Sequence, residues 1–202
     1  MKRLWPGWLL CVLAAGLLAY MGCVKAPAIS LLIGGMKIPD LLPFGYDLDG
    51  ARSLFAAFAS DLADAQAEGR QSASEAYLAL HAGYDLVFPP LFTISLGFCA
   101  FAALFRPEKP IETPRLAAVG FGLVLALAFT YLACDFIENA VADSMFGPKA
   151  LGLALNEQFV FVLRVLTAGK YTTSILALAL VAALWVWRLV SVRRATPPAA
   201  PT

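Results

Sequence analysis

The segment LAAVGFGLVLALAFTYLACDFIENAVA (Leu116–Ala142) joins a long apolar run to an abrupt group of polar residues. It is longer than the roughly 20 apolar residues needed to cross the hydrocarbon core of a bilayer, so it predicts a membrane-spanning helix. Asp135, Glu138 and Asn139 lie near its end at spacings of three and four residues, which places all three on one helical face. At 1.5 Å per residue, Asp135 lies about 28 Å along the helix, near one edge of the hydrocarbon.

Composition and three further apolar runs extend this prediction to the whole chain. Of 202 residues, 60% are hydrophobic and only 14% are charged, well below the roughly 25% charged residues of soluble domains. The further runs are Leu4–Gly22, Leu86–Phe105 and Tyr171–Val190. We therefore expect an all-α integral membrane four-helix bundle, a single membrane domain over residues 1–202 whose surroundings are the lipid bilayer.

The distribution of charge predicts the orientation of the bundle. Eight of the fifteen basic residues fall in three short segments on one side with only two acidic residues, and the other side holds seven basic and twelve acidic residues. By the positive-inside rule, both termini and the tail 195–202 lie in the cytoplasm, with the bundle in the inner (cytoplasmic) membrane. The charged residues on the cytoplasmic side are Lys2, Arg3, Arg106, Glu108, Lys109, Glu112, Arg115, Arg188, Arg193 and Arg194.

The first span has a competing interpretation as a signal peptide. A basic start precedes its apolar run, and Ala26-Pro27-Ala28 resembles a cleavage site. However, the apolar run is longer than a typical signal-peptide core, and proline is unfavourable within a cleavage site. We therefore expect the first span to be retained, with cleavage as the alternative.

Two segments outside the spans carry structural signals of their own. Residues 23–85 are expected to form a largely helical extracytoplasmic cap between spans one and two. Its first part, Lys25–Asp47, is rich in proline and glycine and predicts an extended or turning segment. Leu153–Thr167 is amphipathic and favours a short helix that can continue into span four.

Within the cap, capping residues predict two helices. The first begins at Asp47 or Asp49 and ends near Gly69. Ser72 and Glu75 then form a predicted capping box for a second helix, which runs towards span two. The first helix has an apolar face and a solvent-facing acidic face, formed respectively by Leu54, Phe55, Phe58 and Leu62, and by Asp61, Asp64 and Glu68.

Two consecutive prolines, Pro89-Pro90, lie one turn into span two and free the carbonyl of Asp85 from its helical hydrogen bond. Within lipid such a group needs polar neighbours, so we expect polar side chains to gather there. His81 precedes Asp85 by one turn on the same face, and Lys170 opens span four at the same level. With the polar face of span three, these residues predict one cluster at the outer leaflet.

Three interpretations of this cluster are open. It can be an interhelical clamp in which Lys170 pairs with Asp135 or Glu138, with Arg164 as a second cation. It can be a pocket open to the outer leaflet that binds or processes a lipid-like amphiphile. It can line a path for a cation or a proton, which is disfavoured because no acidic residue lies in the cytoplasmic half of any span.

An enzymatic form of the pocket assigns chemical roles to the same residues. Asp135 or Glu138 would act as general acid or base, Lys170 as an electrostatic partner and Asn139 as an orienting group. The sequence contains no nucleophile elbow, phosphate-binding loop or paired-carboxylate glycosidase signature. We therefore favour a non-enzymatic role and keep the enzyme as the alternative.

No metal, other cofactor or nucleic acid is expected. His81, with its acidic neighbours, offers suitable ligands, but it is the only histidine and belongs to no HExxH motif. No basic stripe with interleaved aromatic residues indicates nucleic-acid binding. The cysteines form no C-x-x-C pair. Cys11 and Cys99 are expected to be apolar filler, whereas Cys23 and Cys134 both lie near the outer face and can be considered a pair.

Four short motifs follow one another along the chain: FGYDLDGA (44–51), YDLVFPPLF (84–92), CDFIENA (134–140) and LTAGKYTTSILAL (166–178). This order resembles an uncharacterised family of small bacterial multi-span membrane proteins, with an FGY loop, D-L-x-x-P on span two, D-x-x-E-N on span three and a lysine opening span four. The doubled proline departs from the single proline of that pattern. The resemblance implies no activity, and it carries over the positions Asp85, Pro89, Asp135, Glu138, Asn139 and Lys170.

The sequence thus favours a multi-pass membrane protein of unassigned activity whose outer-leaflet cluster organises the bundle and binds a lipid-like ligand. The alternatives are a membrane-embedded enzyme that acts on an amphiphile from the extracytoplasmic side, and a small cation or proton transporter. The candidate residues for ligand binding or for the clamp are His81, Asp85, Asp135, Glu138, Asn139 and Lys170.

Overall fold

The computed structural model describes residues 4–105 and 114–194, with side chains to residue 191, and these residues form helices and no strand. This confirms the predicted all-α bundle. Four helical stretches are long and apolar enough to cross a membrane: Trp5–Leu32, Ala73–Leu104, Pro114–Phe146 and Glu157–Ser191. The α-helices are α1 (Trp5–Tyr20), α2 (Ala26–Leu32), α3 (Leu48–Glu68), α4 (Ala73–Leu104), α5 (Pro114–Phe146) and α6 (Glu157–Arg194).

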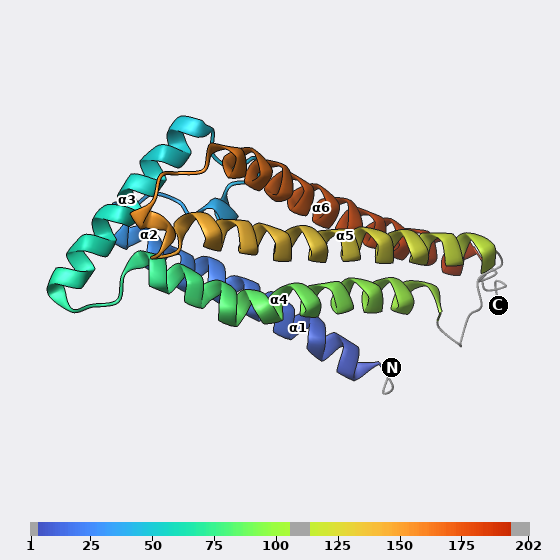
Figure 1. Cartoon of the computed structure of the whole chain (residues 1–202). Helices are drawn as coiled ribbons and strands as arrows, with labels where there is room; N and C mark the ends of the chain where they lie inside the picture. The colour runs from blue at the N-terminus through green and yellow to red at the C-terminus, as the bar shows by residue number, and fades with distance from the viewer. Residues whose placement is uncertain (1–3, 106–113, 195–202) are drawn as a thin grey trace, which may run out of the picture.

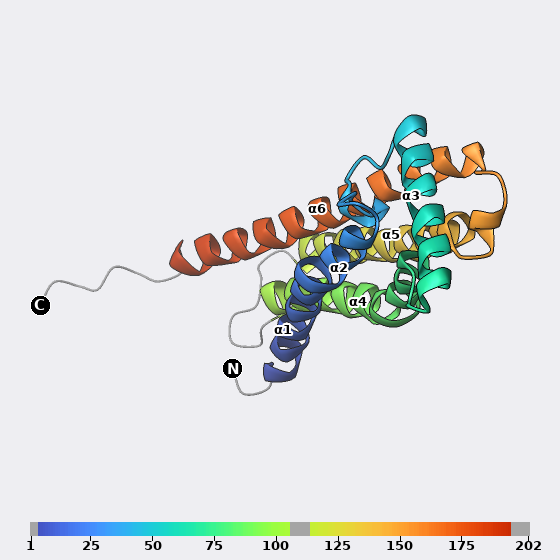
Figure 2. The same cartoon turned by 90° about the vertical axis from the view of Figure 1, so that its left-hand side faces the viewer.

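The long helices lie side by side, and α3 crosses one end of the bundle (Figure 1). The start of α1 and the end of α6 lie at the opposite end in both views (Figure 2). Helix α4 packs against α1, α5 and α6, and α5 packs extensively against α6. Helix α1 instead packs mainly against α4. The bundle is therefore closed between α4, α5 and α6 and looser between α1 and α6.

Two of the long helices begin before the predicted spans. The capped helix that begins after Ser72 and the second span are one helix, α4, which continues through Pro89 and Pro90. Helix α6 begins at Glu157, so the predicted helix before span four is present and is continuous with it. Each helix therefore extends past the polar cluster towards the α3 end.

The segment Lys25–Asp47 differs from its prediction, because its first part is helical. Helix α1 continues through a π-helical turn at Met21–Lys25 into α2, which ends at Leu32. Pro27 is tolerated because it lies in the first turn of α2, directly after a widened turn. The predicted turn follows at Gly34 and Gly35, where φ is 69° and 83°.

Helix α3 follows its predicted caps. Asp47 accepts a hydrogen bond from the backbone N–H of Gly50 at 2.8 Å, and Gly69 ends the helix with φ of 68°. The capping box of Ser72 and Glu75 is present at the start of α4. On the buried face of α3, the Phe58 ring lies 5.7 Å from that of Tyr77, measured between centroids. This contact joins α3 to the end of the bundle.

The prediction that Asp61 faces solvent on α3 is wrong. Its carboxylate is buried, accepts a hydrogen bond from the backbone N–H of Ala73 at 2.5 Å, and lies 2.8 Å from the guanidinium of Arg70. Asp64 is exposed, as predicted. Asp61 is buried because the turn after Gly69 folds α4 back onto α3, which helical periodicity alone does not reveal.

Most residues behind the predicted orientation lie outside the described part of the chain, namely Lys2, Arg3, Arg106, Glu108, Lys109, Glu112, the side chains of Arg193 and Arg194, and the tail 195–202. Arg115 is exposed at the start of α5. Arg188 is buried and donates from Nη1 to the carbonyl oxygen of Ala103 at 2.7 Å. The side of the membrane on which each end lies stays a prediction.

Replacing Asp61 tests the junction between α3 and α4. We expect Asp61→Ala to lower the free energy of unfolding by about 1–3 kcal/mol, because the N–H of Ala73 and the Arg70 guanidinium both lose a charged acceptor. Asp64→Ala is the matched control on the same helix and should change stability by less than about 0.5 kcal/mol. Denaturant titration of the protein in detergent measures both, and equal effects would contradict the buried role of Asp61.

Candidate functional site

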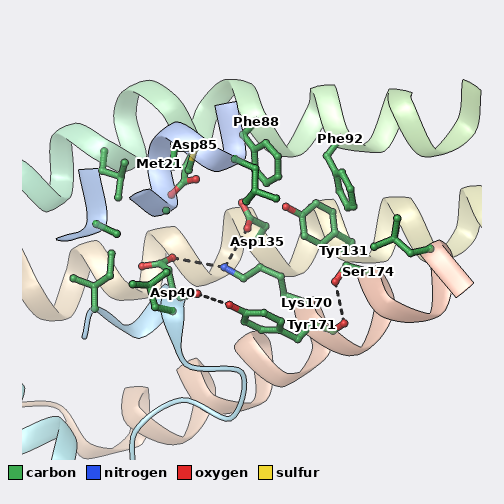
Figure 3. Close-up of a pocket in the computed structure, with 17 residues that line it drawn as sticks. Met21, Asp40, Asp85, Phe88, Phe92, Tyr131, Asp135, Lys170, Tyr171 and Ser174 are labelled. Carbon is green, nitrogen blue, oxygen red and sulfur yellow. Dashed lines mark hydrogen bonds and ion pairs between the residues drawn. The ribbon is translucent and has the colours of Figure 1, made fainter. Parts of the chain in front are cut away.

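The candidate site is organised around Lys170, a buried lysine on α6 that is 8% exposed. Its ammonium contacts Glu138 and lies 3.2 Å from Asp135, both on α5. A third carboxylate, that of Asp40, lies 3.6 Å away (Figure 3). The predicted pairing of Lys170 with Asp135 or Glu138 is thus present with both residues. Thr167, one turn earlier on α6, adds a hydroxyl that donates to Glu138 at 2.6 Å.

The polar face predicted on span three is buried as a unit. Asp135, Glu138 and Asn139 are 3%, 1% and 7% exposed, and all three belong to α5. Burying carboxylates is costly unless they are paired, and Lys170 supplies the pairing cation. The second predicted cation is not part of this group, because the side chain of Arg164 is exposed.

Asp40 belongs to the site but was not predicted there. It lies in a 3₁₀ turn, Pro39–Leu41, that brings the loop after α2 against the bundle. The hydroxyl of Tyr77 donates to the Asp40 carboxylate at 2.6 Å. The hydroxyl of Tyr171 donates to the carbonyl oxygen of Asp40 at 2.8 Å (Figure 3). The sequence IPDLLP (residues 38–43) could have indicated a role for Asp40, since a single acid stands between prolines in an otherwise apolar stretch.

The charge state of Asp40 follows from its neighbours. Burial by itself would raise the pKa of this carboxyl, but His81 and the Lys170 ammonium, together with the Tyr77 hydroxyl, favour the ionised form more strongly. The pKa of Asp40 therefore lies well below its usual range. Asp40 is a carboxylate at physiological pH.

His81 connects the cluster to the end of α5. One ring nitrogen, Nδ1, lies 2.5 Å from the carboxylate of Asp143. The other, Nε2, lies 3.7 Å from Asp40 and 4.0 Å from Asp85. Asp143 was also absent from the predicted site, although it lies one turn after Asn139 on the same face. The structure thus adds a fourth and a fifth carboxylate to the predicted three.

A cavity of about 270 Å³ lies beside the cluster, and its wall is formed by α1, the loop after α2, α4, α5 and α6. Its charged wall contains Asp40, Asp85, Asp135 and Lys170. The rest of its wall is largely apolar and aromatic and includes Leu18, Phe88, Phe92, Tyr131 and Leu178 (Figure 3). Glu138 contacts the Lys170 ammonium but does not line the cavity.

The cysteines do not contribute a covalent link to the site. All four are free thiols, including Cys23 and Cys134, which were considered as a pair. Cys11 and Cys99, expected as separate filler, lie close together with 3.6 Å between their sulfur atoms. They belong to α1 and α4, whose packing brings them together.

Replacing Lys170 tests whether the cluster depends on one cation. We expect Lys170→Met to lower the free energy of unfolding by about 3–5 kcal/mol, because two buried carboxylates, of Asp135 and Glu138, and the half-buried carboxylate of Asp40 lose their partner. Adding Glu138→Gln to that variant should restore part of the loss, since it removes one uncompensated charge. Lys149→Met, at an exposed lysine, is the control. Equal stability of Lys170→Met and Lys149→Met in detergent would contradict this role.

Comparison of the chain with known protein families, with curated proteins and with solved structures finds no significant match. Its proposed function therefore depends on the geometry of the site.

Proposed function

We propose that this chain is an integral membrane protein that binds an amphiphile in the cavity between α1 and α6, with the polar headgroup at the Lys170 cluster. One observation carries the proposal: a cavity with a largely apolar wall ends at a buried cluster of charged side chains. An apolar chain gains free energy by lining such a wall, and a headgroup finds polar partners at its end. A sealed clamp would need no such cavity.

Exposed apolar side chains support insertion into a membrane. The outer faces of the long helices carry large hydrophobic residues, such as Val12, Val119, Phe129, Ile175 and Val186, which are 59–67% exposed. Continuous apolar surface of this kind is rare on soluble monomers. In the proposed topology, these faces contact lipid, α3 covers the extracytoplasmic end, and both termini lie in the cytoplasm.

The cluster also indicates the kind of headgroup. Asp135 lines the cavity, and its Oδ2 is a buried acceptor without a hydrogen-bond partner among the described residues. Its other oxygen faces Lys170. The carboxyl groups of Asp40, Asp85 and Asp135 all line the cavity, so a ligand that donates hydrogen bonds to carboxylates is favoured there. The proposed headgroup therefore carries a hydroxyl or an ammonium group.

The enzymatic alternative is narrowed by the same geometry. Of the two candidate acids, Asp135 lines the cavity, whereas Glu138 contacts Lys170 and does not line it. Asp135 is therefore the residue placed to act as acid or base on a bound molecule. The transport alternative gains no support. Among the described residues, the buried acids are Asp61 on α3, Asp85 in the first half of α4, and Asp135 and Glu138 in the second half of α5. We therefore retain binding as the proposal.

Filling the cavity tests the proposed function. Ser174 lines it, and Ile175, the next residue on α6, is 60% exposed and does not. We expect protein purified in mild detergent to retain a bound amphiphile detectable by mass spectrometry. Ser174→Phe should reduce its amount at least tenfold, whereas Ile175→Phe should not change it. Wild-type protein without any bound amphiphile, or equal retention by both variants, would contradict the proposal.

Cysteine labelling tests the proposed topology. In a background with all native cysteines replaced, a membrane-impermeant thiol reagent added to intact cells should label Lys149→Cys, which is exposed in the turn between α5 and α6. The same reagent should label Lys109→Cys only after the cells are opened. The reverse pattern would place the termini outside.

A further inference from the structure

We propose that Asp40, His81 and Asp85 form a site for a divalent transition-metal ion beside the amphiphile cavity. Each offers one ligand atom, and these atoms all lie within 4.8 Å of one another. His81 and Asp85 are one turn apart on α4, and Asp40 comes from the 3₁₀ turn that packs over them. The expectation of no metal relied on a single histidine outside any HExxH motif, and it did not include Asp40, which the structure places beside His81 and Asp85.

The orientation of His81 is the second observation. The residue is 5% exposed, and its Nε2 is a buried atom without a hydrogen-bond partner among the described residues. Nε2 points towards Asp40 and Asp85, at distances of 3.7 Å and 4.0 Å that are too long for hydrogen bonds. These three groups are therefore close and mutually directed, yet they do not satisfy one another.

Asp143 holds the imidazole in a form suited to metal binding. Its carboxylate lies 2.5 Å from Nδ1, so in the neutral imidazole with its proton on Nδ1 the ring donates to Asp143, and Nε2 keeps the lone pair that a metal ion requires. Metal-binding histidines usually donate their second ring nitrogen to a carboxylate in this way. Tyr77 adds a similar outer contact by donating to Asp40 at 2.6 Å.

The spacing of the ligand atoms also suits one small ion. Ligand atoms at about 2.0–2.2 Å from a tetrahedral zinc ion are roughly 3.3 Å from one another. The distances from His81 Nε2 are 3.7 Å and 4.0 Å, and no two ligand atoms are more than 4.8 Å apart, so every separation exceeds this value by at most about 1.5 Å, which side-chain rotation can close. One imidazole with two carboxylates suits Zn²⁺ or Mn²⁺, whereas Ca²⁺ and Mg²⁺ prefer oxygen ligands alone.

The charge balance of the cluster favours a cation. Among the described residues, the carboxylates of the cluster outnumber its cationic side chains whether or not His81 carries a second proton, and Lys170 already contacts three of the acids. Excess negative charge in a buried site is costly, and a divalent ion reduces it. The acids are Asp40, Asp85, Asp135, Glu138 and Asp143.

The proposed ion also faces the cavity. Asp40 and Asp85 both line the cavity wall, so three protein ligands leave a coordination position directed towards its interior. Asp135, which accepts from the headgroup in the proposed function, is not one of the metal ligands. The metal site is thus distinct from the headgroup contact and does not depend on it.

The test uses the full-length protein in detergent, with Cys23→Ser to remove the exposed thiol. After treatment with a chelator and removal of the chelator, Mn²⁺ is titrated and followed by electron paramagnetic resonance. Zn²⁺ is measured separately by elemental analysis after gel filtration. We expect one equivalent of either ion per chain.

Variants separate a defined site from general attraction by acids. We expect Asp85→Asn and His81→Gln to weaken Mn²⁺ binding at least tenfold, and Asp143→Asn to weaken it by about 10–100-fold through the orientation of His81. Asp64→Asn, at an exposed acid, should bind as the wild type does. Gel filtration identifies any misfolded variant. If one of the three site variants, Asp85→Asn, His81→Gln or Asp143→Asn, is misfolded, the other two decide the result.

Two outcomes would overturn the metal site: no stoichiometric ion on the wild type, or equal affinity in the wild type and in the folded ligand variants. Ser174→Phe keeps this result separate from the proposed function. That variant should lose the amphiphile and still bind one equivalent of Mn²⁺, because Ser174 is not a ligand. Failure to find a bound amphiphile would not contradict the metal site. Failure to find a bound metal ion would not contradict amphiphile binding.

Discussion

The structure depends on one buried ammonium group. Lys170 projects from α6 into a site where Asp135 and Glu138 of α5 and Asp40 of the 3₁₀ turn after α2 converge. Any one of these charges would be costly to bury alone, so each stabilises the others only while the three segments stay together. The contact thereby fixes α6 against α5 and holds the irregular segment after α2 on the bundle.

The cap and the cavity follow from this arrangement. On one side of the cluster, Phe58 of α3 packs with Tyr77 and Phe146, with ring centroids 5.7 Å and 5.4 Å away, and covers the end of the bundle. On the other side, α1 packs mainly on α4 and leaves space next to α6. The cluster is therefore covered towards α3, and the cavity lies beside it between α1, α4, α5 and α6.

The chemistry of the cluster has one persistent feature, an excess of acceptors over donors. Asp135 Oδ2 and His81 Nε2 are both buried without a partner among the described residues, and they face different parts of the site. Native proteins rarely leave such groups unsatisfied without a reason. A donating headgroup accounts for the first, and a metal ion accounts for the second, so the two proposals explain separate observations.

The sequence by itself determined the four apolar helices, the caps of α3 and α4, and the common face of Asp135, Glu138 and Asn139. These features arise from contacts a few residues apart, so local spacing reveals them. Only the tertiary structure decided that Asp40 joins Lys170, that Asp143 holds His81, and that Asp61 is buried. Irregular loops have no periodicity, and helix register does not show which distant segment packs on a given face. The partners of Asp40, Asp143 and Asp61 depend on how the loop after α2, the start of α4 and the end of α5 pack together.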